Sequence, residues 1–288
     1  MGEFNLIKID GKPIEKLLDV VSKGIGKIYL PRAKRKEADA KAYEIEVIER
    51  AKAKAYLNRQ EIEQDLLDRI EERILYRELK KQKNIDAVTM IAAEELYNEN
   101  NISDIPVDED WTVRFFNVVE DVSDEMMQQL WGRILAGEVK SPNSFSIRTI
   151  ECLKNITKQE AELFTKTANF VFIYNNEPFI FTGDNLEVII KNDFSLEEAL
   201  ILMELGLLQS ETNLVLDLKS ETKDKEMLFV FGKDIIKVIK KANTEKQQIP
   251  ILGLTRAGKE LLKLLTITPI DVYINNFCVY LRQKEFIV

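Results

Sequence analysis

The chain has 288 residues, of which 45% are hydrophobic and 31% are charged, and its formal net charge is −8. The apolar content is sufficient for a folded core and excludes a wholly disordered protein, while the negative balance argues against nucleic-acid binding through bulk charge. The sequence contains no histidine, which excludes Ser-His-Asp and Cys-His catalysis and removes the commonest metal ligand.

The two cysteines, Cys152 and Cys278, are far apart in the sequence. Their position among apolar residues indicates small buried side chains in a reducing compartment, not a disulfide framework. The N-terminal residues lack the pattern of a secretory signal, and no apolar run reaches the roughly 18 residues of a membrane span. We therefore expect a cytoplasmic protein with no cofactor and no bound metal.

The first region, residues 1–98, is predicted to be helical. Apolar residues recur at helical spacing over residues 13–29. Residues 85–98 are predicted to form another helix. Residues 33–83 lack Pro and Gly and interleave charges of both signs, which predicts one long helix, or two helices joined near Asn58. Such a segment forms a protruding arm or a coiled-coil-like hairpin. Its apolar stripe requires a partner, so we expect a homo-oligomer through residues 34–83.

Basic residues gather at the beginning of this arm. They are Lys27, Arg32, Lys34, Arg35 and Lys36. One interpretation is a solvated helix start; the other is contact with an anionic membrane surface, which would place the protein at the periphery of the inner membrane. The stretch from Glu94 to Glu125 carries eleven acidic residues and one basic residue, and it would also complement this basic segment.

The central region, residues 99–170, is predicted to contain short helices joined by a fixed loop. We expect Asp110 and Ser123 to cap two of them, Gly137 to end the second, and Ser146 to cap the next. Trp131 shares an apolar helix face with Leu130 and Ile134, which indicates a core position. Thr157 with Glu160 forms a capping box that begins a further helix.

Five residues of this region are candidates for binding a ligand or a partner. They are Arg133, Glu138, Ser144, Ser146 and Arg148. The two arginines can hold a phosphate or a carboxylate, or they can pair with local acids such as Glu138 and Glu151. The hydroxyl groups are first of all turn and cap residues, because no base stands near them to activate a nucleophile.

The last region, residues 171–288, alternates strands and helices. A hairpin is predicted around Asn175-Asn176, and two strands, 214–218 and 227–231, flank a charged turn. With a helix begun by the Ser195–Glu198 capping box, this order is similar to a winged helix. Its balanced charge favours protein binding over DNA binding. The predicted fold is thus a mainly α N-terminal half with a long helical arm, followed by a smaller α+β, winged-helix-like module.

The block LWGRILAGEVKSPNSFSIRTIECLKNITKQEAELF resembles a bacterial family of proteins of unknown function, numbered 2806. The segments PIEKLLDVVSKGIGKIYLPRAKRKEADAKA, LEEALILMELGLL and LTRAGKELLKLL are similar to the same family. The resemblance implies a setting in phage defence, in the style of abortive-infection proteins. It implies no catalytic residues.

Our first functional hypothesis is therefore a non-enzymatic defence component that associates with other proteins and senses a phage or host factor. One alternative is a membrane-perturbing effector that uses the N-terminal amphipathic segment, and another is a DNA-binding regulator that uses the C-terminal module. The last alternative, a Mg²⁺-dependent nuclease, would need acids from separated positions such as Asp184, Asp193 and Glu197.

Overall fold

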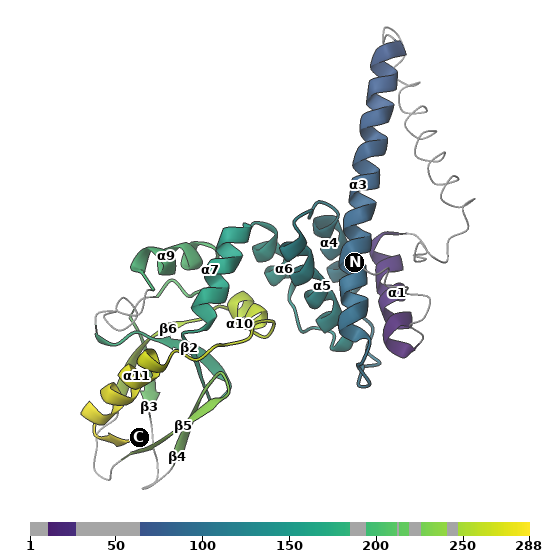
Figure 1. Cartoon of the computed structure of the whole chain (residues 1–288). Helices are drawn as coiled ribbons and strands as arrows, with labels where there is room; N and C mark the ends of the chain where they lie inside the picture. Colours follow the sequence, from purple (N-terminus) through teal and green to yellow (C-terminus); the bar gives the residue numbers. More distant parts are fainter. Residues whose placement is uncertain (1–10, 27–63, 185–193, 212, 219–225, 241–246) are drawn as a thin grey trace. The chain divides into compact units, whose positions relative to one another are not determined.

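The computed structural model forms two compact units, residues 1–147 and 148–288 (Figure 1). The residues that it describes are 11–26, 64–184, 194–211, 213–218, 226–240 and 247–288. The first unit contains the helices α1 (Lys12–Gly24), α3 (Gln64–Leu96), α4 (Glu109–Val119) and α5 (Glu125–Lys140). The division into three regions that the sequence suggests stays a prediction.

The second unit mixes helices with strands. Its helices are α6 (Ile147–Lys154), α7 (Lys158–Ala168), α9 (Leu196–Glu204), α10 (Arg256–Leu262) and α11 (Asp271–Gln283). Its strands are β1 (Val171–Tyr174), β2 (Glu177–Phe181), β3 (Leu214–Leu218), β4 (Glu226–Phe231), β5 (Asp234–Lys240), β6 (Gln247–Gly253) and β7 (Phe286–Ile287). The coarse prediction of a helical first half followed by a mixed region is confirmed.

Helix α3 is the longest described element. Its 33 residues extend over about 50 Å at 1.5 Å per residue. The sequence predicted that one helix ends near Lys83 and another begins at 85, but the helix continues through Asn84. The buried Asn84 amide donates to the backbone oxygen of Glu120 at 2.8 Å and accepts from Gln128 at 3.3 Å. Asn84 therefore makes tertiary hydrogen bonds from within the helix and does not end it. Residues 34–63 of the predicted arm lie outside the described residues.

The core of the first unit forms where α3 packs against α5 and α1 packs against α4. Trp131 is 1% exposed, as predicted for a core residue, and meets the edge of the Phe115 ring at 5.4 Å; Phe115 also stacks on Trp111. Gly132 lets α5 approach α3 closely, because a Cβ atom there would lie 2.4 Å from Ile91. Aromatic packing and one close helix approach thus fix this helical unit.

The caps of α4 and α5 differ from the prediction by one or two residues. Asp108, not Asp110, caps α4, and Asp124, not Ser123, caps α5. Helix α5 also continues past Gly137 to Lys140. A Cβ atom on Gly137 would come within 2.7 Å of the Phe145 ring. This glycine therefore makes room for a side chain and does not end the helix.

The second unit is built on a seven-stranded antiparallel sheet in the order β3-β6-β2-β1-β4-β5-β7, which curls into a half-barrel. The predicted hairpin is confirmed: β1 pairs with β2, and Asn175 and Asn176 both have positive φ. Asparagine tolerates this conformation, which the tight hairpin turn requires. The described strands thus form two local hairpins, β1–β2 and β4–β5, together with several long-range pairings.

The winged-helix-like prediction is not confirmed. The two strands that would form a wing, β3 and β4, do not pair with each other. Strand β3 lies at one edge beside β6, whereas β4 lies between β1 and β5. The sequence identified both strands correctly, but strand periodicity does not reveal which strands become neighbours.

Helix α11 packs on one face of the curled sheet through aromatic side chains (Figure 1). The ring centre of Phe277 lies 4.4 Å from that of Phe172, 5.0 Å from that of Phe181 and 5.3 Å from that of Phe229. The buried Tyr273 hydroxyl donates to the backbone oxygen of Phe181 at 2.7 Å. These contacts make α11 an integral part of the second core. Among the described helices, none is long and apolar enough to cross a bilayer.

Candidate functional site

Glu138 is the buried centre of the block that the sequence singled out. Its side chain is on α5 and only 1% of the residue is exposed. One carboxylate oxygen accepts from the backbone N–H of Asn143 at 2.6 Å, and the other accepts from that of Phe145 at 2.9 Å. Charge-assisted bonds of this kind are strong. The carboxylate therefore fixes the loop between α5 and α6.

The loop residues complete this arrangement. Asn143 has a φ of 70°, and the Ser144 hydroxyl donates to the backbone oxygen of Ser141 at 2.6 Å. Ser146 directly precedes α6 and is partly exposed. The structure thus brings Glu138 together with the backbone of this loop, and the position of Ser144 agrees with its predicted role as a turn residue.

Lys16 on α1 lies on the same side of the first unit as this carboxylate. Its ammonium group donates to the backbone oxygen of Ser103 at 2.9 Å. Burial lowers the pKa of Lys16, and attraction by Asp104 and Glu138 partly offsets that effect. Lys16 thus has a backbone acceptor and two carboxylates that attract its charge, which suits a structural role better than proton transfer.

The two candidate arginines are both exposed. Arg133 on α5 lies 3.9 Å from the Glu95 carboxylate of α3, so its acidic partner is Glu95 and not Glu138. Arg148 is in the first turn of α6. Neither arginine is part of a buried phosphate clamp, because both side chains are exposed. The Arg133–Glu95 pair is a surface ion pair, which is weak because water screens it.

A second buried carboxylate, Glu260, was missed by the sequence reasoning. It is 6% exposed; it accepts from the Thr149 hydroxyl at 2.6 Å and from Arg256 Nε at 2.8 Å. The bond to the fully buried Thr149 ties α10 to α6. The only sequence signal was the Arg-to-Glu spacing of four residues, which is typical of solvent-facing helix surfaces and therefore concealed the burial.

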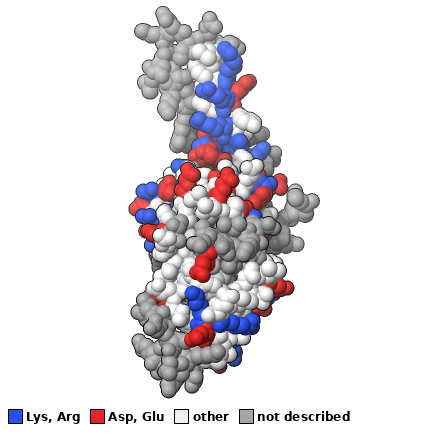
Figure 2. Space-filling model, turned by 90° about the vertical axis from the view of Figure 1, so that its left-hand side faces the viewer, with Lys and Arg blue, Asp and Glu red and all other residues white. Residues whose placement is uncertain are grey.

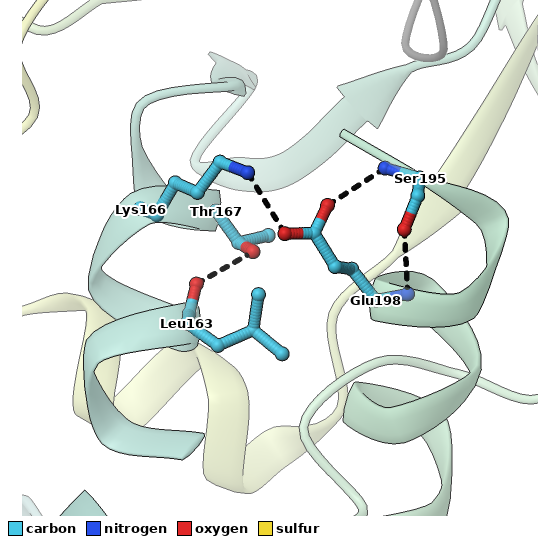
Figure 3. Close-up of polar contacts among 5 residues, drawn as sticks. All are labelled: Leu163, Lys166, Thr167, Ser195 and Glu198. Carbon is cyan, nitrogen blue, oxygen red and sulfur yellow. Dashed lines mark hydrogen bonds and ion pairs between the residues drawn. The ribbon is translucent and has the colours of Figure 1, made fainter. Parts of the chain in front are cut away.

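The α7–α9 contact holds another polar cluster (Figure 3). The predicted Ser195–Glu198 capping box is confirmed, and Lys166 of α7 donates to the Glu198 carboxylate at 2.8 Å. Partial burial raises the pKa of Glu198, but the bonds from Lys166 and Ser195 outweigh it and hold that pKa below its usual value. The Thr167 hydroxyl donates to the backbone oxygen of Leu163 at 2.8 Å, so each polar group in this view has a structural partner.

The cysteines and the separated acids do not gather into a metal-binding group within the part of the chain that the structure describes. Burial raises the pKa of both thiols, Cys152 and Cys278, which favours the unreactive neutral form. Asp184 accepts from the Tyr280 hydroxyl at 3.2 Å, and Glu197 is exposed in the first turn of α9. Within the residues that the structure covers, no three metal-binding side chains cluster; Asp193 lies outside them.

The predicted membrane-facing segment is only partly covered by the structure. Lys27, Arg32, Lys34, Arg35 and Lys36 lie outside the described residues. The apolar side of α1, which precedes them, is buried within the first unit. Ile14, Leu17, Val20 and Val21 are at most 5% exposed. This helix therefore uses its apolar side for internal packing.

One exposed feature among the described residues of the first unit is a line of side chains along α3 and the turn that follows it, here termed the α3 stripe. It consists of Arg69, Glu72, Arg73, Tyr76, Leu79, Lys80, Lys83, Glu94 and Tyr97, all of them exposed. At 3.6 residues per turn they fall within a sector of about 120°. Figure 2 shows Lys and Arg side chains along the upper part of α3. Tyr76 is 71%, Leu79 47% and Tyr97 56% exposed.

A model of the family DUF2806, described as proteins of unknown function, matches residues 68–278. This range includes the α3 stripe, both buried carboxylates and the strands β1 to β6 of the curled sheet. No curated protein and no solved structure matches the chain significantly.

Proposed function

The chain belongs to the DUF2806 family of proteins of unknown function, and from this starting point we propose that it acts without catalysis, by protein–protein association. The resemblance described above gives the setting of the proposal, which is the defence of a bacterium against phage. In that setting the protein senses or recruits a phage or host protein. In this proposal the buried polar clusters stabilise the fold, and an exposed surface binds the partner protein.

The observation that supports this proposal is the exposure of large side chains on the α3 stripe. Tyr76 and Leu79 expose 71% and 47% of their surface on one side of α3, and Tyr97 exposes 56% in the turn directly after it. Burying such a side chain contributes about 1.5–3 kcal/mol, and tyrosine and arginine are enriched at protein interfaces. An aromatic and aliphatic line bordered by arginines is therefore suited to a protein partner.

The two alternatives have less support. A membrane effector needs a free apolar surface, but α1 buries its own against the other helices of the first unit. A DNA-binding regulator needs a basic recognition helix, and the neighbouring strands that would form its wing are separated in the sheet. Protein association is therefore the function that we favour.

Site-specific crosslinking tests the proposal in living bacteria. A photo-crosslinking amino acid at Tyr76 should give a protein adduct, and the same residue at Ile105, which is 60% exposed in a loop, should not. Mass spectrometry identifies the partner. Absence of an adduct at Tyr76 under phage challenge, with a stable and folded protein, would refute association through α3.

A plaque assay tests the defence setting separately. The double variant Tyr76→Ala/Tyr97→Ala should lose most of the protection that the parent chain gives. The matched variant Ile105→Ala/Val113→Ala removes two exposed apolar side chains elsewhere in the first unit and should retain it. If the parent protects against none of a broad phage panel, the setting is wrong, whereas the crosslinking result on association still stands.

A further inference from the structure

We infer that the α3 stripe binds a second copy of this chain in antiparallel orientation. The inference rests on the proposed function, because it names the partner of the same surface. Its basis is the distribution of charge along α3, together with the position of one small residue.

The α3 stripe is positive in its N-terminal half and negative at its C-terminal end. Arg69, Arg73, Lys80 and Lys83 are accompanied there by one acid, Glu72. Glu94 lies in the last turn of α3. The stripe therefore has two ends of opposite charge.

Several of these charges have no counter-ion within the described part of the chain. Arg73, Lys80, Lys83 and Glu94 make no ion pair with any residue that the structure describes. Glu94 is also unfavourable where it stands, because the C-terminal end of a helix carries a partial negative charge. A basic group from another molecule would relieve this repulsion.

A second copy supplies the missing charges only when it runs antiparallel. In that orientation the basic half of each stripe faces the acidic end of the other, and the same contact forms twice about a two-fold axis. A parallel copy would place basic half against basic half. Tyr76 and Leu79 of one copy would then lie near Tyr97 of the other, which buries the exposed aromatic side chains.

Ala87 marks the crossing point. It lies in the same sector of α3 as the stripe residues and is half-buried, and its small side chain permits close approach of two helices. Lys80 and Glu94 stand seven residues to either side of it. A two-fold axis at Ala87 therefore sets Lys80 of each copy opposite Glu94 of the other.

Reciprocal charge reversal in the full chain tests this arrangement by sedimentation velocity. The parent should dimerise, more weakly as salt increases. Lys80→Glu alone and Glu94→Lys alone each place like charges opposite each other at both contacts, so each should weaken dimerisation about tenfold or more. A 1:1 mixture of the two variants places opposite charges at both contacts and should restore a heterodimer with parental affinity.

A matched control is Lys154→Glu, which makes the same change of charge at an exposed position of α6 and should dimerise like the parent. Dimerisation of the single variants like the parent, or no restoration in the mixture, would overturn the antiparallel arrangement. A parent that stays monomeric at tens of micromolar, a range in which weak interfaces dissociate, would overturn the second copy as partner. In that case a Tyr76 adduct with another protein would leave the proposed function intact.

Discussion

Two buried carboxylates show how single residues hold this fold. Glu138 accepts two backbone N–H bonds of the loop that follows its own helix, and Glu260 joins Thr149 of a distant helix. The sequence analysis named Glu138 as a possible ion-pair partner for arginine. In the folded chain its buried carboxylate instead accepts hydrogen bonds from the nearest backbone N–H groups. A buried carboxylate is stable only when such partners are complete.

Replacing Glu138 should therefore destabilise the first unit. Glu138→Ala leaves the N–H groups of Asn143 and Phe145 without their acceptors and should lower the free energy of unfolding by roughly 3 kcal/mol; Glu138→Gln keeps one acceptor and should cost about half as much. Chemical denaturation measures both. Gln129→Ala, at an exposed position of the same helix, should stay within about 0.5 kcal/mol of the parent.

The opposite result would also be informative. A Glu138→Ala variant that unfolds like the parent but gives no protection in the plaque assay would identify this carboxylate as a binding group, and the structural interpretation of the loop would be wrong.

At the scale of elements, helix starts depend mainly on local sequence. Both predicted capping boxes, Thr157–Glu160 and Ser195–Glu198, form as expected, because all their bonds lie within four residues. The caps of α4 and α5 were misplaced because several Asp and Ser residues stand side by side there and each is a competent cap. Which of these residues becomes the N-cap depends on how the following helix packs.

The capping box of α9 predicts a defined pH dependence. The pKa of Glu198 is held below its usual value of 4.5 in the folded chain, so its stabilising effect is present above that value and is lost as the pH falls through the lowered pKa. Glu198→Gln should therefore be less stable than the parent at pH 7, and the difference should vanish once the pH is well below 4.5.

Thermal unfolding across this pH range measures the difference. Glu162→Gln, at an exposed position of α7, provides the comparison and should show little pH-dependent change. A constant deficit of Glu198→Gln down to the lowest pH would mean that the ion pair with Lys166 does not act through charge.

At the scale of the whole molecule, each of the two units has its own core. The second unit gathers Phe172, Phe181, Phe229, Tyr273 and Phe277 around the contact of α11 with the curled sheet. A domain with its own core can fold alone.

We therefore expect a fragment of residues 144–288 to fold without the first unit. It should unfold cooperatively and show near-ultraviolet circular dichroism, which reports fixed aromatic packing. A fragment of residues 144–268, which lacks α11, should lose both properties. A longer fragment that binds a hydrophobic dye and unfolds gradually would show that the second unit depends on the first.

The sequence by itself determined the features whose causes lie within a few residues. The asparagines of the β1–β2 turn, the two capping boxes, the helical first half and the core position of Trp131 follow from local conformational preference and from apolar periodicity. Only the tertiary structure decided which groups meet over long separations. Thr149 and Glu260 are 111 residues apart, and β3 pairs with β6 and not with β4. Asn84 stays inside a helix because its amide finds partners at the C-terminal end of α4 and on α5. Periodicity tells which side of an element is buried, but the identity of the neighbour depends on how the whole chain packs.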